Sequence, residues 1–363
     1  MRRALEFARR GQGFVEPNPM VGCVIVRGED VVGEGHHEVF GGPHAEINAM
    51  QMAGEQCGGG TLYVTLEPCC HFGKTPPCTQ AIIAAGIKRV VAAMRDPFPK
   101  VSGGGFAELE RAGIEVAHGV LQAEAEELNA PYLKLLREGR PWVIAKWAMT
   151  LDGKIATSSG QSKWISGPES REIVQQLRAR MDAIVIGRRT AELDDPLLTA
   201  RLRDGAKPAR VAARIVVDSA ASLSLSSQLV RTAREVPLLI AASTSAEANR
   251  VATLTAAGAE VIQLPGASAA ERLKQLLDEL GRRRLTNILV EGGGQLLGSL
   301  FEAGLADEVH CFIAPKVFGG SGAPGPVGAQ GVASLHRAWQ FAHVGRRIVG
   351  DDIYIHGRLK KRS

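Results

Sequence analysis

The chain has 363 residues, of which 45% are hydrophobic and 22% are charged, which excludes a disordered protein and leaves room for about two ordinary domains. Its formal net charge of +5 suits a phosphorylated small molecule as well as a nucleic acid, so charge alone selects neither. Apolar runs stay below the ~18 residues that cross a membrane, and the amino-terminal stretch lacks the apolar core of a signal peptide. We therefore expect a cytoplasmic protein without a membrane partner. The basic runs at residues 282–284 and 360–362 are expected to be solvated surface.

Helix-like and strand-like runs alternate along the first part of the chain. An amphipathic helix is expected over residues 5–10, ended by Gly11 or Gly13. Further helices are expected over residues 44–52, 79–85 and 124–137, the last despite Pro131. Strands are expected over residues 21–26, with 31–32 as the hairpin partner, and over residues 61–66, 89–93 and 114–116.

The pattern restarts after a junction at residues 138–141, so we expect two domains, 1–139 and 140–363, with different functions. In the second part, proline in the first turn favours a helix over residues 168–181, and residues 206–213 are expected to form a surface loop. The alternation of the two element types predicts the α/β class for both parts. Strands are expected over residues 142–148, 183–186, 214–217, 237–241 and 287–290.

The strongest chemical signal is His44-Ala45-Glu46, followed by Cys69 and then Cys78. Clustered cysteines in a cytosolic chain favour metal over disulfides, and one histidine with two thiolates is a good donor set for one zinc ion. Three protein ligands leave a fourth position for water, which zinc activates at neutral pH. Glu46 lies two residues from His44 at the start of a helix, and we expect it to move protons during a hydrolytic deamination.

The spacing departs from the usual deaminase pattern, because eight residues instead of two separate Cys69 from Cys78. Cys70 and His71 are therefore competing ligands. Cys78 is favoured because it opens a helix, where the positive end of the dipole stabilises a thiolate. A closed structural zinc site with His71 as fourth ligand is the alternative, but it gives Glu46 no role.

Three segments closely resemble the bifunctional riboflavin-biosynthesis deaminase–reductases: His44-Ala45-Glu46, the stretch from Cys69 to Cys78, and residues 16–22. The resemblance implies a cytidine-deaminase-like three-layer domain that binds zinc through His44, Cys69 and Cys78 and uses Glu46 as proton shuttle. It also implies the substrate, 2,5-diamino-6-ribosylamino-4(3H)-pyrimidinone 5′-phosphate, a phosphorylated pyrimidine. The residues that it places around this substrate are Asn18, His37, Lys74 and Thr75.

In the second part, an apolar run over residues 288–290 leads through Glu291 and three glycines into a helix that reaches Gly304. A strand, a glycine turn and a helix present backbone amides to an anion, although a turn without a ligand is an equally good interpretation of this segment alone. The glycine order does not match the G-x-G-x-x-G fingerprint of dinucleotide-binding domains.

The second part resembles the reductase domain of the same family, on residues 146–156, 162–165, 194–201, 216–219 and 291–294. The resemblance implies a dihydrofolate-reductase-like α/β domain in which NADPH transfers a hydride to C1′ of the ribosylamino group and opens the sugar to a ribityl chain. Asp194 is the expected catalytic residue. Cofactor positions fall on Ala148, Trp164, Thr190, Asp194, Ser219, Gly293, Gly294, Gln295, Leu296, Leu297, Gly298 and Ser299, and substrate positions on Ser162, Arg178, Leu198, Arg201 and Glu291.

The function predicted first is therefore a two-step enzyme of riboflavin synthesis, with zinc and NADPH as cofactors. The alternative is a nucleobase or tRNA deaminase with an accessory domain. A zinc-dependent nucleic-acid-binding module is disfavoured, because aromatic residues, which stack on bases, make up only 5% of the chain. The oligomeric state stays open, a homo-oligomer included. So does the role of Arg188 and Arg189, which either meet the 2′-phosphate of the cofactor or face solvent.

Overall fold

The computed structural model describes residues 1–360 and divides the chain into two compact units, Met1–Gly139 and Arg140–Ser363. Helix α6 (Ala130–Glu138) closes the first unit, and Gly139 follows it with a left-handed φ of 67°. Glycine adopts this conformation at little cost, so the chain leaves the helix at this point and the second unit begins.

A five-stranded sheet forms the centre of the first unit, in the order β2-β1-β3-β4-β5. Strand β1 pairs antiparallel with β2 and β3, whereas β3, β4 and β5 run parallel. The strands are β1 (Gly22–Arg27), β2 (Asp30–His36), β3 (Thr61–Val64), β4 (Arg89–Ala92) and β5 (Glu115–His118), and the helices before α6 are α1 (Arg2–Arg9), α2 (Ala45–Ala53), the short η1 (Gly54–Cys57), α3 (Cys78–Ala84), α4 (Gly104–Arg111) and α5 (Gln122–Leu128).

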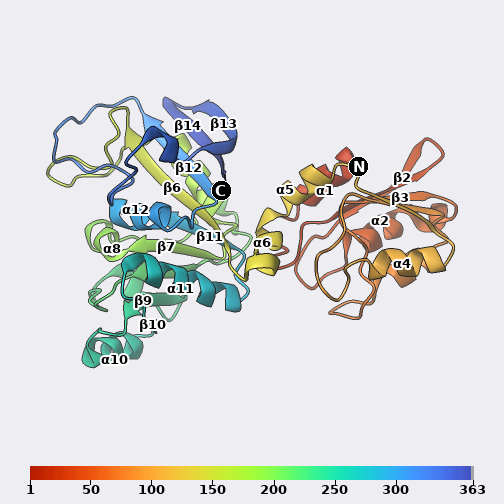
Figure 1. Ribbon diagram of the computed structural model, residues 1–363, viewed down its shortest axis with the longest axis horizontal. Coiled ribbons are helices and arrows are strands. Elements are labelled where there is room, and N and C mark those ends of the chain that lie inside the picture. Colours follow the sequence, from red (N-terminus) through yellow and green to blue (C-terminus); the bar gives the residue numbers. More distant parts are fainter. Residues whose placement is uncertain (361–363) are drawn as a thin grey trace. The chain divides into compact units, whose positions relative to one another are not determined.

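Helices cover both faces of this sheet, so the unit has three layers (Figure 1). Two glycines on opposite faces of the sheet allow helices α1 and α2 to pack closely against its strands. A Cβ at Gly22 would lie 2.0 Å from the Ala4 carbonyl oxygen of α1, and a Cβ at Gly35 would lie 2.5 Å from the Ala49 nitrogen of α2. Helix α2, which follows His44, is thereby fixed directly against β1 and β2.

A nine-stranded sheet forms the centre of the second unit, in the order β10-β9-β8-β7-β11-β6-β12-β14-β13. The first seven strands of this order run parallel, and β14 pairs antiparallel with β12 and β13. The strands are β6 (Trp142–Thr150), β7 (Ala183–Gly187), β8 (Ala213–Val217), β9 (Leu238–Ser243), β10 (Glu260–Leu264), β11 (Asn287–Glu291), β12 (Glu308–Ala314), β13 (Phe341–Val349) and β14 (Asp352–Leu359), and the helices are α7 (Pro168–Arg178), α8 (Arg188–Asp194), η2 (Arg203–Gly205), α9 (Gln228–Arg231), α10 (Ala248–Ala256), α11 (Ala269–Arg282), α12 (Gly294–Glu302) and η3 (Leu335–Arg337).

Two hydrophobic cores lie on the two faces of the second sheet. Val143 and Ala145 of β6 pack in the core that contains α11 and α12, whereas Ile144 packs in the core that contains Leu177 of α7. This alternation follows from the two-residue period of a strand. It turns Lys146, the next even position, toward the α7 face.

The predicted elements are present, with two differences in the first unit. The single helix expected over residues 124–137 is two helices, α5 and α6, which meet at Asn129 because Pro131 can only occupy the first turn of a new helix. Helix α4 was not expected, because it begins within three consecutive glycines, residues 103–105, which favour a turn over a helix.

In the second unit, the helices α8, α9, α10 and α11, strand β10 and the strands from β12 onward were not expected. Arg282, Arg283 and Arg284 are exposed, as expected, and residues 361–362 of the second basic run lie outside the described residues. Within residues 1–360, the structure contains no helix that combines the length and the apolar character needed to span a bilayer.

Candidate functional site

The three predicted zinc ligands converge in the first unit. His44 immediately precedes α2, Cys69 follows β3, and Cys78 is the first residue of α3. The Nδ1 atom of His44 lies 3.5 Å from the Cys69 sulfur and 3.3 Å from the Cys78 sulfur. All three ligand atoms lie within 4.8 Å of one another, the spacing that a tetrahedral ion requires.

The electrostatics of this group favour thiolate at Cys69. Hydrogen bonds from the Cys78 thiol and from His44 lower the pKa of Cys69 to about 4, against the effect of burial. The backbone N–H of Cys78, at the start of α3, also donates to this sulfur over 3.3 Å. Cys78 has a raised pKa because it donates to Cys69 and is buried. One nitrogen and two sulfurs with a preformed negative charge fit zinc.

Glu46 lies in the first turn of α2 and is only 3% exposed. Burial raises the pKa of its carboxyl to about 7, while the neighbouring His44 acts in the opposite direction. Its carboxyl is close enough to Cys78 to accept a hydrogen bond from the thiol. The side chain therefore reaches the metal group without belonging to it.

The two competing ligands point elsewhere. The Cys70 sulfur lies 3.7 Å from the Lys100 carbonyl oxygen, and the His71 ring packs near Phe98 with the ring centroids 5.7 Å apart. Neither residue belongs to the metal group formed within residues 1–360. The choice of Cys78 over Cys70 is therefore confirmed.

The four residues expected around the first substrate lie next to this centre. Asn18 Nδ2 is 3.3 Å from His37 Nε2, and the buried His37 ring stands edge-on to the His44 ring. Thr75 Oγ1 is 3.4 Å from Nε2 of His44, the ring nitrogen that faces away from the sulfurs. Lys74 is exposed, with its ammonium over the Phe40 ring.

In the second unit, the predicted cofactor and substrate positions gather where the parallel strands end. Glu291 ends β11, and Gly292 and Gly293 follow with positive φ before α12 begins. A Cβ at Gly293 would lie 3.2 Å from the Thr190 hydroxyl, so the glycine turn lies against the first turn of α8. Ligands of open parallel sheets bind at this edge, and the amides of the turn are suited to an anion.

A buried ion group lies on the α7 face of β11 and β6. Arg178 donates to both Glu291 oxygens, over 2.6 and 2.8 Å, and Lys146 Nζ lies 4.0 Å from the same carboxylate. Burial alone would raise the pKa of Glu291, but the charges of Arg178 and Lys146 lower it to about 2. Burial in turn lowers the pKa of Lys146.

Asp194, at the end of α8, is held by two neighbouring residues. The Ser162 hydroxyl donates to its carboxylate over 3.1 Å, and Lys163 Nζ donates to its backbone carbonyl over 2.7 Å. Trp164 follows with its ring exposed and the Arg171 guanidinium 4.7 Å above it. Two predicted substrate and cofactor positions, Ser162 and Asp194, are thus brought into contact.

The remaining predicted positions differ in exposure. Arg201 is exposed, and its backbone N–H donates to Gln175 of α7. Leu198 is buried and has a positive φ of 53°. Ala148 is half-buried on β6, Ser219 is exposed after β8, and within α12 Gly294 and Ser299 are half-buried, Gln295 is exposed, and Leu296, Leu297 and Gly298 are buried.

Lys146 was missed as a site residue. The available signal was a lysine between apolar residues of an expected buried strand, because a buried ammonium requires a partner of opposite charge. That partner, Glu291, lies on a strand far away in the sequence, so the two residues could not be paired before the strand order was known.

Comparison with known families supports both halves of this arrangement. Residues 1–94 match the family described as "Cytidine and deoxycytidylate deaminase zinc-binding region". Residues 141–350 match the family described as "RibD C-terminal domain". The riboflavin biosynthesis protein RibD of Escherichia coli (strain K12) is 42% identical, over 98% of this chain and 97% of its own length. The chain belongs to the RibD family.

Other RibD proteins show the same agreement over nearly the whole chain. That of Actinobacillus pleuropneumoniae is 41% identical over 98% of this chain and 93% of its own length. Among solved structures, Acinetobacter baumannii RibD, form 1, has a TM-score of 0.87 at 34% identity, covering 99% of this chain and 97% of that one. A diaminohydroxyphosphoribosylaminopyrimidine deaminase/5-amino-6-(5-phosphoribosylamino)uracil reductase from Thermotoga maritima has a TM-score of 0.83 at 34% identity, with the same two coverages.

Membership of the RibD family decides the general function. The chain is a bifunctional deaminase and reductase of riboflavin biosynthesis, with a cytidine-deaminase-like domain followed by a RibD reductase domain. Its deaminase domain has the zinc site of His44, Cys69 and Cys78, and its reductase domain uses NAD(P)H. The expected fold class, enzyme class and cofactor types are confirmed.

Proposed function

We propose that the chain deaminates 2,5-diamino-6-ribosylamino-4(3H)-pyrimidinone 5′-phosphate at its 2-amino group and then reduces the ribosyl group of the product to ribityl with NADPH. The Thermotoga maritima relative is described as a diaminohydroxyphosphoribosylaminopyrimidine deaminase and a 5-amino-6-(5-phosphoribosylamino)uracil reductase. The observation that carries the proposal is the pairing of a buried carboxyl, Glu46, with the three ligand atoms of His44, Cys69 and Cys78.

In the first step, zinc bound by these three residues supplies Lewis-acid activation of the attacking water. Glu46 accepts one proton from the attacking water and delivers it to a ring nitrogen of the pyrimidine, and then moves the second proton of that water to the amine, which departs as ammonia. A carboxyl with a pKa near 7 exchanges protons in both directions at neutral pH. The Thr75 hydroxyl fixes the orientation of the His44 ring from its far nitrogen.

The residues around the metal group supply substrate recognition. We assign Asn18 and the buried His37, which lie in contact, to polar atoms of the pyrimidine. The exposed Lys74 carries the charge suited to the substrate phosphate. Its position over the Phe40 ring limits the directions in which it extends.

In the second step, bound NADPH would supply a hydride to C1′, while the bond between C1′ and the sugar ring oxygen breaks and that oxygen takes up a proton. We assign the group of Arg178, Glu291 and Lys146 to the substrate, because it places both charge signs at the carboxyl edge of the sheet. Asp194, oriented by Ser162, is the last residue of α8, the helix that follows β7, and is the proposed catalytic and cofactor-positioning carboxylate. Arg201 is exposed and suited to bidentate binding of the substrate phosphate.

We further infer that residues 1–139 carry deamination and residues 140–363 carry reduction, each with its own core. A reducing, cytoplasmic compartment is supported by six cysteines that are all free in the structure. Whether the chain forms a homo-oligomer stays a prediction.

The test is to incubate the purified protein with the diaminopyrimidine phosphate, with and without NADPH, and to identify the products by mass. Replacement of one amino group by oxygen without NADPH, followed by gain of two hydrogens with NADPH, is the expected result. A fragment of residues 1–139 should perform the first step alone. An unchanged substrate mass with zinc-loaded protein would contradict the proposed substrate, whereas a soluble, zinc-loaded but inactive fragment would contradict the division of labour.

A further inference from the structure

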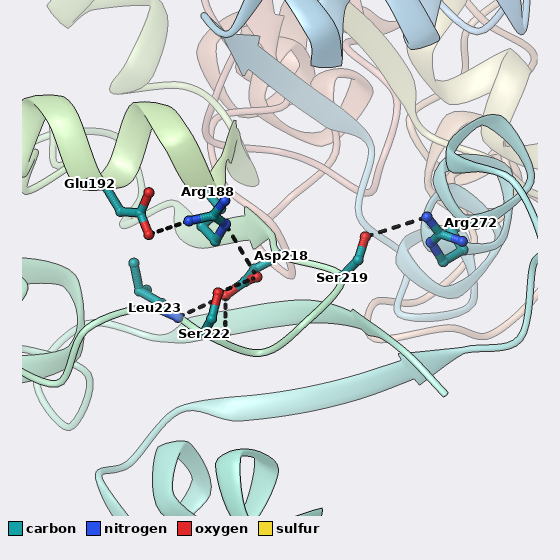
Figure 2. A network of polar contacts seen from close by, with 7 residues as sticks. All are labelled: Arg188, Glu192, Asp218, Ser219, Ser222, Leu223 and Arg272. Carbon is teal, nitrogen blue, oxygen red and sulfur yellow. Dashed lines mark hydrogen bonds and ion pairs between the residues drawn. The ribbon is translucent and has the colours of Figure 1, made fainter. Parts of the chain in front are cut away.

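A serine and an arginine from distant segments meet beyond the end of β8. Ser219 lies two residues after the last residue of β8 and is exposed, and Arg272 Nη2 lies 3.4 Å from its hydroxyl. Arg272 belongs to the first turn of α11. Figure 2 shows the two side chains directed toward each other. A hydroxyl and a guanidinium together form a small site for an anion.

The guanidinium of Arg272 is held in place by the loop that precedes its helix. Its Nη1 atom donates to the Gly266 carbonyl oxygen over 2.8 Å and to the Ala267 carbonyl oxygen over 3.3 Å. These acceptors are neutral, so the positive charge is not cancelled by them. The arginine therefore presents its Nη2 edge toward Ser219 in a preset orientation, which lowers the entropic cost of binding an anion.

The acidic residue next to Ser219 is turned away from this site. Asp218 is buried, and its carboxylate accepts hydrogen bonds from the backbone N–H groups of Ser222 and Leu223, over 2.6 and 2.8 Å. Its Oδ1 atom also lies 3.8 Å from Nε of Arg188, an ion pair that is drawn in Figure 2. These hydrogen bonds hold the carboxylate inside the turn, and the charge of Arg188 offsets part of its repulsion of an anion at Ser219.

Arg188 is a weaker candidate for the same anion. It forms an ion pair with Glu192 one turn later on α8 and lies beside Asp218, so two carboxylates already compensate its charge. Of the two guanidinium groups drawn in Figure 2, the one at Arg272 is therefore the better placed to bind a new negative group.

The place of this pair in the sheet relates it to the cofactor. Strand β8 lies two strands from β11, whose glycine turn is suited to a pyrophosphate, and this separation is about 10 Å at the usual strand spacing. An apolar recess formed by Val217, Ala241 and Leu273, among others, adjoins Ser219 and Arg272. Apolar walls next to a cationic group suit an adenine ring and a phosphate on its ribose.

We propose that Arg272 and Ser219 bind the 2′-phosphate of NADPH and so select it over NADH. Enzymes that prefer NADH place a carboxylate where it accepts from the ribose hydroxyls, whereas a nearby arginine accommodates the 2′-phosphate. Here the carboxylate of Asp218 is withdrawn, and a serine and an arginine take the exposed positions. This inference rests on the proposed use of NADPH by the second unit.

The test measures dissociation constants of NADPH and NADH for the full chain by tryptophan fluorescence, since all four tryptophans lie in the second unit. Arg272→Ala should weaken NADPH binding by about tenfold to a hundredfold, the scale of a hydrogen bond to a charged group, while NADH binding stays close to the wild-type value. Arg282→Ala is the matched control, because Arg282 ends the same helix, is exposed and forms an ion pair with Glu279. It should leave both constants unchanged.

Arg272→Ala also removes the contacts of Arg272 with the preceding loop, so a second variant is needed to separate this structural effect from the loss of anion binding. Ser219→Asp keeps Arg272 and adds a carboxylate at the site, so it should weaken NADPH selectively and by a similar factor. Equal weakening of both dinucleotides by both variants would overturn the proposal, as would a loss of discrimination in Arg188→Ala instead of Arg272→Ala. A wild-type protein that binds both dinucleotides equally would contradict this inference alone. One that binds neither would contradict the proposed reductase function itself.

Discussion

Arg178 holds the buried carboxylate of Glu291 with two hydrogen bonds, of 2.6 and 2.8 Å, from a helix to a strand 113 residues farther along the chain. With Lys146 nearby, this pair concentrates three charges on one face of the second sheet. Such a group is costly to break, because the partner left behind is buried and uncompensated.

The first prediction concerns acid sensitivity. The pKa of Glu291 is lowered from 4.5 to about 2 in the folded state, so its contribution to stability is present above pH 4.5 and is lost as the pH falls toward 2. Between pH 7 and pH 3.5 the second unit should lose roughly 1–2 kcal/mol of unfolding free energy from this group. Glu291→Gln should lack this part of the loss in urea unfolding followed by tryptophan fluorescence, and an identical pH dependence in both proteins would contradict the assignment.

The second prediction concerns proton transfer in deamination. Glu46→Gln keeps the size of the side chain but removes the group that moves protons, so deamination should fall by at least ~10²–10⁴-fold. Zinc content should not change, because Glu46 is not a ligand. The variant should still reduce the deaminated intermediate with NADPH at close to the normal rate. Loss of both reactions in a folded protein would favour one composite site over two.

The third prediction separates two cysteines of one segment. Cys78→Ala removes a sulfur that lies 3.3 Å from the His44 nitrogen and should lose most of the zinc. Cys70→Ala removes a sulfur directed at the Lys100 carbonyl, and this variant should keep its zinc. Metal analysis of the two purified variants checks this directly, and the opposite result would exclude the ligand assignment.

The fourth prediction concerns the phosphate of the second substrate. Arg201→Ala should raise the KM of reduction about tenfold to a hundredfold, the effect of losing one charge-assisted contact of ~1.5–3 kcal/mol, and should leave deamination unchanged. Arg203→Ala is the control, because Arg203 is exposed nearby and pairs with Glu172. Equal KM values in the two variants would show that Arg201 does not bind the substrate phosphate.

The fifth prediction concerns Asp194. Asp194→Asn keeps the contact with Ser162 but removes the charge, so reduction should fall by roughly tenfold or more, the scale of a hydrogen bond to a charged group. Deamination should be intact. Glu192→Gln, on the same helix and exposed, is the matched control in steady-state kinetics. A normal rate of reduction by Asp194→Asn would show that Asp194 has only a structural role at the end of α8.

The sequence by itself determined the chemistry of the first site. His44, Glu46 and Cys78 are linked to local features, namely the start of α2 and the start of α3, and the choice of Cys78 over Cys70 followed from helix position. The alternation of element types predicted the α/β class, because side-chain periodicity is a local property of the chain.

Only the tertiary structure decided which distant residues meet in the second unit. Strand β11 lies between β7 and β6 although it follows β10 in the chain, and this insertion brings Glu291 to Lys146 and the glycine turn to Thr190. Arg272 reaches Ser219 across 53 residues in the same way. The order of parallel strands depends on how whole helices and strands pack into two cores, and no short segment of sequence contains that information.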